Sequence, residues 1–201
     1  MRLDQKHLLA QLGNDLLACA PPRLSLCPWA RPVHNDGKLR YSFSDACCPG
    51  DEQQLMAEVF REIGILSSFH DNEGPETTII VAPSLWRDDF LSFTSFVQDV
   101  EELLKVEGLD EDLQIVGFHP LHCFAGDAID DPGNYVNRAP HPALHLLRQD
   151  SVTNAIDSHP DTLDVPSANA RLLRKLGSVH MERLLRAACD EADQHAPPQC
   201  E

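Results

Sequence analysis

The chain has 201 residues, 42% of them hydrophobic, which is enough for one domain with a buried core. Its formal net charge of −16 at pH 7 opposes general binding to nucleic-acid phosphates and to anionic membranes. No segment approaches the roughly 20 apolar residues of a membrane-spanning helix, and residues 1–12 lack the apolar run of a secretory signal. We therefore expect an acidic cytoplasmic protein with no nucleic-acid or membrane partner, whose seven cysteines are reduced thiols.

The first half of the chain predicts alternating helices and strands. In chain order these are a helix over 4–19, a short apolar run over 24–26, a strand over 39–43, a helix capped by Asp51, a strand over 77–82, a helix started by Asp88 or Asp89, and a strand over 113–118. Helical crossovers between successive strands imply parallel pairing with right-handed connections. We therefore expect an α/β fold with a small three- to four-stranded, largely parallel sheet.

Beyond Phe118 the periodicity fails, and a polar loop extends from His119 to Pro142. A loop of this length in a compact chain is usually functional or disordered, and its aromatic residues argue against disorder. Pro142 predicts the first turn of a helix through Leu147, and further helices follow over 166–176 and from residue 178. The expected domains are an N-terminal helix at 1–22, one α/β domain at 23–177, and a C-terminal helix with a frayed tail at 178–201.

The polar loop begins at the edge of the predicted sheet where ligands collect, beyond the carboxyl ends of parallel strands. Cys27, Asp45, Pro83 and His119 all follow predicted strand ends. Cys27 can act as a nucleophile if an imidazole lowers its pKa, and His119 or His122 can be that base. A buried cysteine that only fills space is the structural alternative.

Metal-ligating side chains are frequent in and after the loop. Four of the ten histidines lie between positions 119 and 145, together with Cys123 and the aspartates at 127, 130 and 131. Their spacing matches no standard zinc motif, so hydrogen-bonded loop histidines are the alternative and we assign no metal ligand. The adjacent pair Cys47–Cys48 suits no familiar disulfide framework.

Two arginines stand out in a chain with twice as many acidic as basic residues. Arg138 and Arg148 each offer a planar fork for a carboxylate or a phosphate. The structural alternative is internal ion pairing with Asp130, Asp131 or Asp150. In the same loop, asparagines at 134 and 137 can orient a ligand or satisfy backbone groups.

Several motifs occur in a recognisable order. They are Leu26-Cys27-Pro28-Trp29-Ala30, Thr77 to Val81, Gln114 to Pro120, Asp131, Asn134, Asn137 to Pro142, and Leu144 to Arg148. In this order they resemble domain-of-unknown-function family 1415, which has bacterial and some eukaryotic members, and the resemblance runs from about Leu26 to Gly177. It implies no established activity, cofactor or catalytic residue. The family pattern has an aromatic residue at the position of His122, which counts against that histidine as an essential base or ligand.

The predicted catalytic residues are Cys27, His119 and Asp131. The predicted substrate-binding residues are Asn134, Asn137, Arg138, His145 and Arg148. The leading hypothesis is an enzyme acting on a small anionic metabolite, with an unknown cofactor requirement. In it Arg138 and Arg148 hold the anion, His119 is the general acid or base oriented by Asp131, and Cys27 is the nucleophile. The second is a non-catalytic ligand-binding or assembly module whose polar loop is structural, and the third is a metal-dependent hydrolase.

Overall fold

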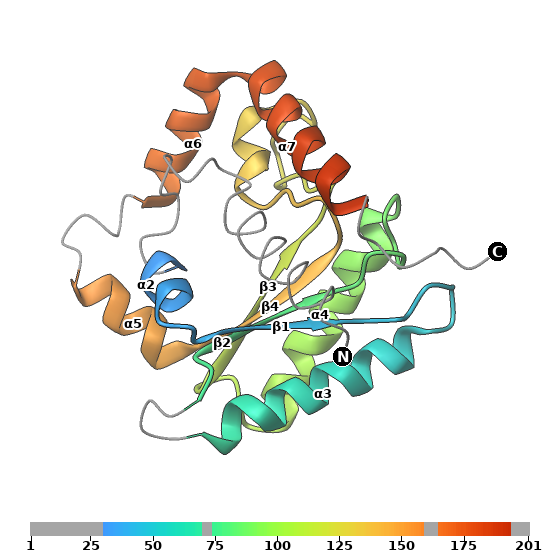
Figure 1. Ribbon diagram of the computed structural model, residues 1–201, viewed down its shortest axis with the longest axis vertical. Coiled ribbons are helices and arrows are strands. Elements are labelled where there is room, and N and C mark those ends of the chain that lie inside the picture. The colour runs from blue at the N-terminus through green and yellow to red at the C-terminus, as the bar shows by residue number, and fades with distance from the viewer. Residues whose placement is uncertain (1–29, 70–73, 159–164, 194–201) are drawn as a thin grey trace.

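A four-stranded sheet forms the centre of the computed structural model, which describes residues 30–69, 74–158 and 165–193 (Figure 1). Its strands lie in the order β1 (Leu39–Phe43), β2 (Thr77–Val81), β4 (Ala143–Arg148) and β3 (Leu113–Phe118). The sequence predicts strands over 39–43, 77–82 and 113–118, and the structure has a strand at each of these positions. The predicted helix over 4–19, the apolar run over 24–26 and Cys27 lie outside the described residues.

The sheet is mixed, so the prediction of a largely parallel sheet is wrong. β1 pairs with β2 in parallel, whereas β4 pairs antiparallel with both β2 and β3. β1, β2 and β3 therefore run in the same direction, and β4 runs between β2 and β3 in the opposite one. The physical reason is that the chain returns to the sheet from the carboxyl edge through the long loop, without a helix that would carry it back to the starting edge.

The sequence predicts a helix from Pro142 to Leu147, but residues 143–148 form strand β4 instead. A short apolar run does not by its periodicity distinguish a buried strand from a buried helix. Here the run is buried from Ala143 through Leu147, with side chains directed alternately to the two faces of the sheet. Pro142 precedes the strand, where its missing N–H costs no ladder hydrogen bond, and its carbonyl accepts the N–H of Ala82 at 2.9 Å.

Helices α3 (Glu52–Ser68) and α4 (Phe90–Val106) cover one face of the sheet and enclose the main core. Right-handed crossovers that move across the sheet in one direction place both helices on the same face. The Asp89 side chain accepts the N–H of Ser92 and so caps α4 as predicted. The core side chains come from both helices and from strands β2, β3 and β4: Leu55, Val59, Ile63, Leu66, Phe93, Phe96, Val100, Leu104, Ile80, Ile115, Leu144 and Leu146.

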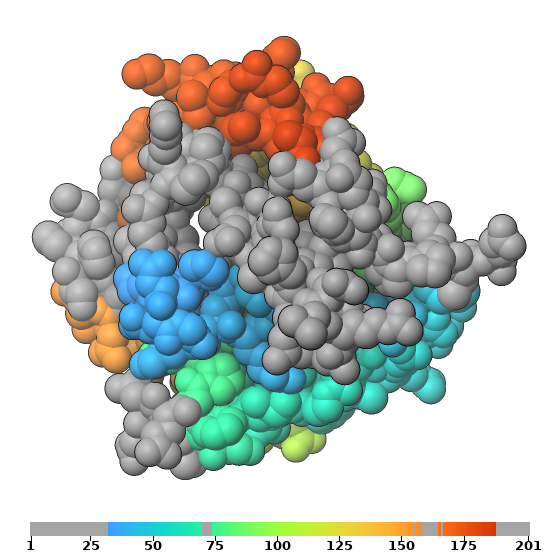
Figure 2. Space-filling model, viewed as in Figure 1, coloured from blue at the N-terminus to red at the C-terminus, as the bar shows by residue number. Residues whose placement is uncertain are grey.

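The remaining helices flank the sheet and the long loop. α2 (Ala30–Asn35) precedes β1, and α5 (Gln149–Ser158) follows β4. α6 (Val165–Leu176) and α7 (Ser178–Asp193) meet at Gly177 and form the upper part of the molecule in Figures 1 and 2. They pack on the short 3-10 helix η1 (Pro132–Val136) through a small buried cluster of Tyr135, Leu173 and Met181. None of the described helices is both long and apolar enough to cross a membrane.

Candidate functional site

The carboxyl ends of β1, β2 and β3 meet the start of β4 along one edge of the sheet. Phe43 is in register with Val81, and both Val81 and Phe118 are in register with Ala143. The polar loop leaves this edge after Phe118 and rejoins it at Ala143. The loop therefore lies at the edge where ligands are expected in sheets of this kind.

His119 is fully buried, and main-chain groups engage both of its ring nitrogens. Nε2 lies 2.7 Å from the carbonyl oxygen of Trp86, and Nδ1 accepts the N–H of Leu121 at 3.0 Å. Because Nδ1 accepts a hydrogen bond, the proton of the neutral ring lies on Nε2, which donates to the carbonyl oxygen of Trp86. Burial lowers the pKa of His119, so the ring is neutral at pH 7. Because both nitrogens have main-chain partners, these contacts favour a structural role over the expected acid–base role.

Trp86 explains why the fold needs this histidine. Its φ of 57° lies in the left-handed region, which bulky side chains rarely adopt. The ring packs on Phe93 and Phe96, with centroid distances of 6.4 and 5.0 Å, while the carbonyl accepts the hydrogen bond from His119. His119 thereby holds a strained turn between β2 and α4 in place.

Asp131 contacts α6 and does not orient His119. Its carboxylate accepts the Gly133 N–H at 2.6 Å, which caps η1, and Nε of Arg174 lies 3.0 and 3.1 Å from the two carboxylate oxygens. The hydrogen bond from Arg174 and that from Gly133 lower the pKa of Asp131. The aspartate thus fastens the loop to α6 through Arg174, a residue that no sequence motif indicates.

The two asparagines differ in their side-chain contacts. Asn134 is fully buried; its Oδ1 accepts the N–H of Phe124 at 3.0 Å, and its Nδ2 donates to the carbonyl of Ala128 at 2.8 Å. The carbonyl of Asn137 accepts the His119 N–H at 3.0 Å, and no hydrogen bond from its side-chain amide is seen within the part of the chain that the structure describes. Asn134 is therefore structural, while the Asn137 amide retains its capacity to bind a ligand.

Arg138 binds the backbone of its own loop. Nε donates to the carbonyl of His122 at 3.0 Å, and Nη2 donates to the carbonyl of Ile129 at 2.7 Å. The guanidinium carbon lies 4.5 Å from the centroid of the Tyr135 ring, a cation–π distance. The predicted structural alternative was pairing with aspartate, but the partners are main-chain carbonyls.

Arg148 stands apart from the loop, at the far end of β4. Its Nη2 donates to the carbonyls of Leu66 and Phe69, the latter at 2.9 Å. These carbonyls belong to the C-terminal end of α3, where helical C=O groups lack intrahelical partners. Arg148 therefore caps α3, and the structure does not bring it together with Arg138 to hold one anion.

His145 lies on the sheet face away from α3 and α4. It is in register with Ile79 on one side and Val116 on the other, and its ring lies 6.1 Å from that of Phe118. Burial lowers its pKa to about 4, so the imidazole is neutral at pH 7. With so low a pKa the imidazole is a weak base, but a neutral ring is able to hydrogen-bond a ligand.

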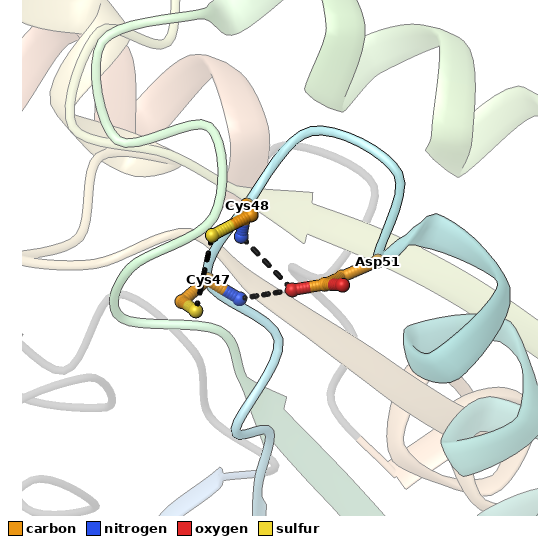
Figure 3. Close-up of side chains that lie close together, drawn as sticks. All are labelled: Cys47, Cys48 and Asp51. Atoms are coloured by element: carbon orange, nitrogen blue, oxygen red, sulfur yellow. Dashed lines mark hydrogen bonds between the residues drawn. The ribbon is translucent and has the colours of Figure 1, made fainter. Parts of the chain in front are cut away.

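The histidines of the loop do not form a metal site within the described residues. His122 packs on Phe90 and Phe124, and burial, with a smaller effect of Arg138, lowers its pKa to about 4. Over residues 30–69, 74–158 and 165–193, one group of three or more side chains has metal-ligating atoms close together. It consists of Cys47, Cys48 and Asp51 (Figure 3). The adjacency of the two cysteines was the available sequence signal, but it does not reveal the contact with Asp51.

Three apolar side chains of the loop are exposed, which the sequence pattern does not predict. Leu121 is 44% exposed, Phe124 39% and Ile129 72%. Asn134 and Arg138, both polar, are directed inward to the backbone of the same loop. In this part of the loop, polar side chains thus bind the backbone while apolar side chains face solvent.

Comparison with known proteins gives one family. The family described as "Protein of unknown function (DUF1415)" matches residues 22–183, which confirms the resemblance noted in the sequence. Comparisons with curated proteins and with solved structures found no significant match. The family match carries no activity.

Proposed function

The chain belongs to the DUF1415 family, and we propose that it is a non-catalytic binding module whose recognition surface is the loop 119–142. The observation that carries this proposal is the combination of internal polar contacts and exposed apolar side chains in the loop. Its polar side chains hold the backbone, and three apolar side chains face solvent. A small anionic ligand would have to break the internal contacts, whereas a partner protein would use the loop as it stands.

The internal hydrogen bonds make the loop rigid before it binds anything. Asn134 and Arg138 make five of them, all to main-chain atoms of residues 122–129. The ion pair between Asp131 and Arg174 fastens the loop to α6. A surface that is ordered in the free protein loses little conformational entropy on binding, which favours affinity.

The chemistry of the exposed side chains defines the partner. Leu121, Phe124 and Ile129 offer apolar area, and Asp130, which follows Ile129, is also exposed. The whole chain carries a net charge of −16. The complementary partner is a protein segment that presents apolar side chains flanked by lysine or arginine.

Peptide display against the immobilised full-length chain tests this function. We expect enrichment of peptides that combine apolar side chains with lysine or arginine. Their affinity should fall about tenfold or more in the double variant Phe124→Ser/Ile129→Ser. The matched control is Val106→Ser/Val179→Ser, which also removes two exposed apolar side chains, 73% and 81% exposed, from helices α4 and α7. Equal binding to both double variants, or no enriched peptide, would refute the proposal.

A second candidate function is the enzyme acting on a small anionic metabolite, which the neutral, buried imidazole of His145 supports. In this alternative His145 binds the substrate and Cys27, outside the described residues, is the nucleophile. A thermal-shift screen of small carboxylates and phosphates separates the two candidates. Stabilisation that His145→Gln abolishes and Phe124→Ser/Ile129→Ser leaves intact favours the enzyme and counts against the binding module.

A further inference from the structure

The loop between β1 and α3 carries two adjacent cysteines, Cys47 and Cys48, and is separate from the loop 119–142. It begins at the carboxyl end of β1, where the N–H of Ser44 donates to the carbonyl of Val81 at 2.8 Å. Ala46 is fully buried in the core under α3 and α4. The backbone that bears the cysteines is therefore anchored on the side of the sheet.

Asp51 anchors the same backbone on the side of the helix. The sequence predicted that Asp51 caps α3, but its side chain makes no capping hydrogen bond. Instead Oδ2 accepts the backbone N–H groups of Cys47 and Cys48, both at 3.0 Å (Figure 3). These two hydrogen bonds lower the pKa of Asp51, so the carboxyl group is ionised at neutral pH. A carboxylate is thus held beside two thiols.

The turn brings the two sulfur atoms together. In an extended chain, consecutive side chains point to opposite faces. Here the Sγ atoms of Cys47 and Cys48 lie 3.4 Å apart, which is too far for the roughly 2.05 Å bond of a disulfide. One ligand atom from each cysteine and one from Asp51 all lie within 4.8 Å of one another.

These separations fit the requirements of a tetrahedral zinc-type ion. Two sulfurs at about 2.3 Å from one ion are about 3.8 Å apart, and an oxygen bound at about 2.0 Å lies about 3.5 Å from each sulfur. The two sulfur atoms are 3.4 Å apart, and all three ligand atoms lie within 4.8 Å of one another, so the cluster is close to this geometry. Small side-chain rotations suffice to reach them.

An ion has access to this cluster and is attracted to it. Cys48 is exposed, while Cys47 and Asp51 are partly exposed. The negative potential of a chain with a net charge of −16 raises the local concentration of cations. Thiolates select soft and borderline ions, whereas Mg²⁺ and Ca²⁺ prefer sites built from oxygen ligands.

We propose that Cys47, Cys48 and Asp51 bind a thiophilic divalent cation of the zinc type, with water as the fourth ligand. Three protein ligands and one open position are characteristic of zinc sites that interact with a further molecule, whereas closed structural sites have four protein ligands. Binding requires both thiols in the thiolate form, so it releases protons and strengthens as the pH rises.

The test is a titration of the reduced full-length chain, without an affinity tag, with Zn²⁺ in competition with a chromophoric chelator. We expect one tightly bound ion per chain. Titration with Co²⁺ should give a sulfur-to-metal charge-transfer band, which reports thiolate ligands directly. Both signals should disappear in Cys47→Ser/Cys48→Ser. In Asp51→Asn, which keeps an oxygen to accept the two backbone N–H groups, the affinity should fall about tenfold or more.

Cys123→Ser is the matched control, because Cys123 is also a thiol in a loop but lies outside the cluster. It should leave the stoichiometry and the charge-transfer band unchanged. Melting curves recorded without metal show whether each variant remains folded. The proposal is overturned if the wild type binds no ion at micromolar Zn²⁺, or if the double serine variant binds Zn²⁺ as tightly as the wild type.

Discussion

Arg174 on α6 and Asp131 in the loop 119–142 are 43 residues apart in the chain and form a two-oxygen ion pair, with distances of 3.0 and 3.1 Å from Nε. The same carboxylate caps η1 through Gly133. One side chain therefore sets both the start of η1 and the position of α6 against it. This ion pair is one contact through which the C-terminal helices affect the proposed recognition surface.

Replacing Asp131 with asparagine should lower the melting temperature at neutral pH. Asparagine keeps an acceptor for the Gly133 N–H but loses the charge that faces Arg174. Because the folded-state pKa of Asp131 is below its ordinary value of 3.8, the carboxylate stabilises the fold above about pH 4, and this contribution is lost as the pH falls through the folded pKa. Melting curves from pH 7 to pH 3 should show wild type and variant converging in acid.

The neighbouring substitution Asp130→Asn is the control for that series, since Asp130 is exposed. Its melting temperature should follow that of the wild type at every pH. A gap between wild type and Asp131→Asn that widened in acid would show that the charge of Asp131 does not stabilise the fold.

Arg138→Ala should destabilise the protein by about 2 kcal/mol in urea unfolding, because it removes two hydrogen bonds from a cation to main-chain carbonyls. Arg138→Lys should recover only part of this loss, since one ammonium group does not reproduce the planar fork. Arg186→Ala is the matched control: its ion pair with Glu182 on α7 is exposed, and its removal should change stability by less than about 0.5 kcal/mol. If Arg138→Ala behaves like the control, Arg138 does not hold the loop.

The buried His145 should make the protein sensitive to mild acid. In the unfolded chain an imidazole takes up a proton near its ordinary pKa of 6.5, whereas burial keeps His145 neutral in the fold down to a pKa of about 4. The stabilising contribution is therefore complete above pH 6.5, and it declines by about 1.4 kcal/mol per pH unit between 6.5 and 4. Urea unfolding at pH 7, 6 and 5 should show a shallower decline for His145→Gln than for wild type. Identical slopes would mean that His145 is protonated as readily in the folded protein as in the unfolded chain.

The elements that the sequence predicts well are those whose pattern is local. β2 is a continuous β-branched run, and α4 has an apolar stripe that begins after Asp89. Both patterns lie within a single short segment of the sequence. β4 lacks such a signal, because a buried apolar run suits either a helix or a strand. Its antiparallel direction depends on where the loop re-enters the sheet.

The roles of the polar residues depend on partners far away in the chain, and the sequence does not reveal these. Arg148 caps a helix that ends about 80 residues earlier, with a separation of 82 residues to Leu66. Asp131 has aspartate neighbours and Arg138 close by in sequence, yet its partner is Arg174. The polar loop lies where the sequence predicts it. Whether each of its polar side chains binds the backbone or is available to a ligand follows only from the three-dimensional contacts.

The position of β4 has a consequence for synthesis on the ribosome. β2 and β3 do not pair with each other, and each pairs with β4 on its inner side. Until residues 143–148 have emerged, both strands present open edges, which are templates for pairing with other chains. A nascent chain is thus prone to aggregate once β3 has emerged and before residues 143–148 have emerged, and rapid translation at this stage, at about 5–20 residues per second, shortens that exposure.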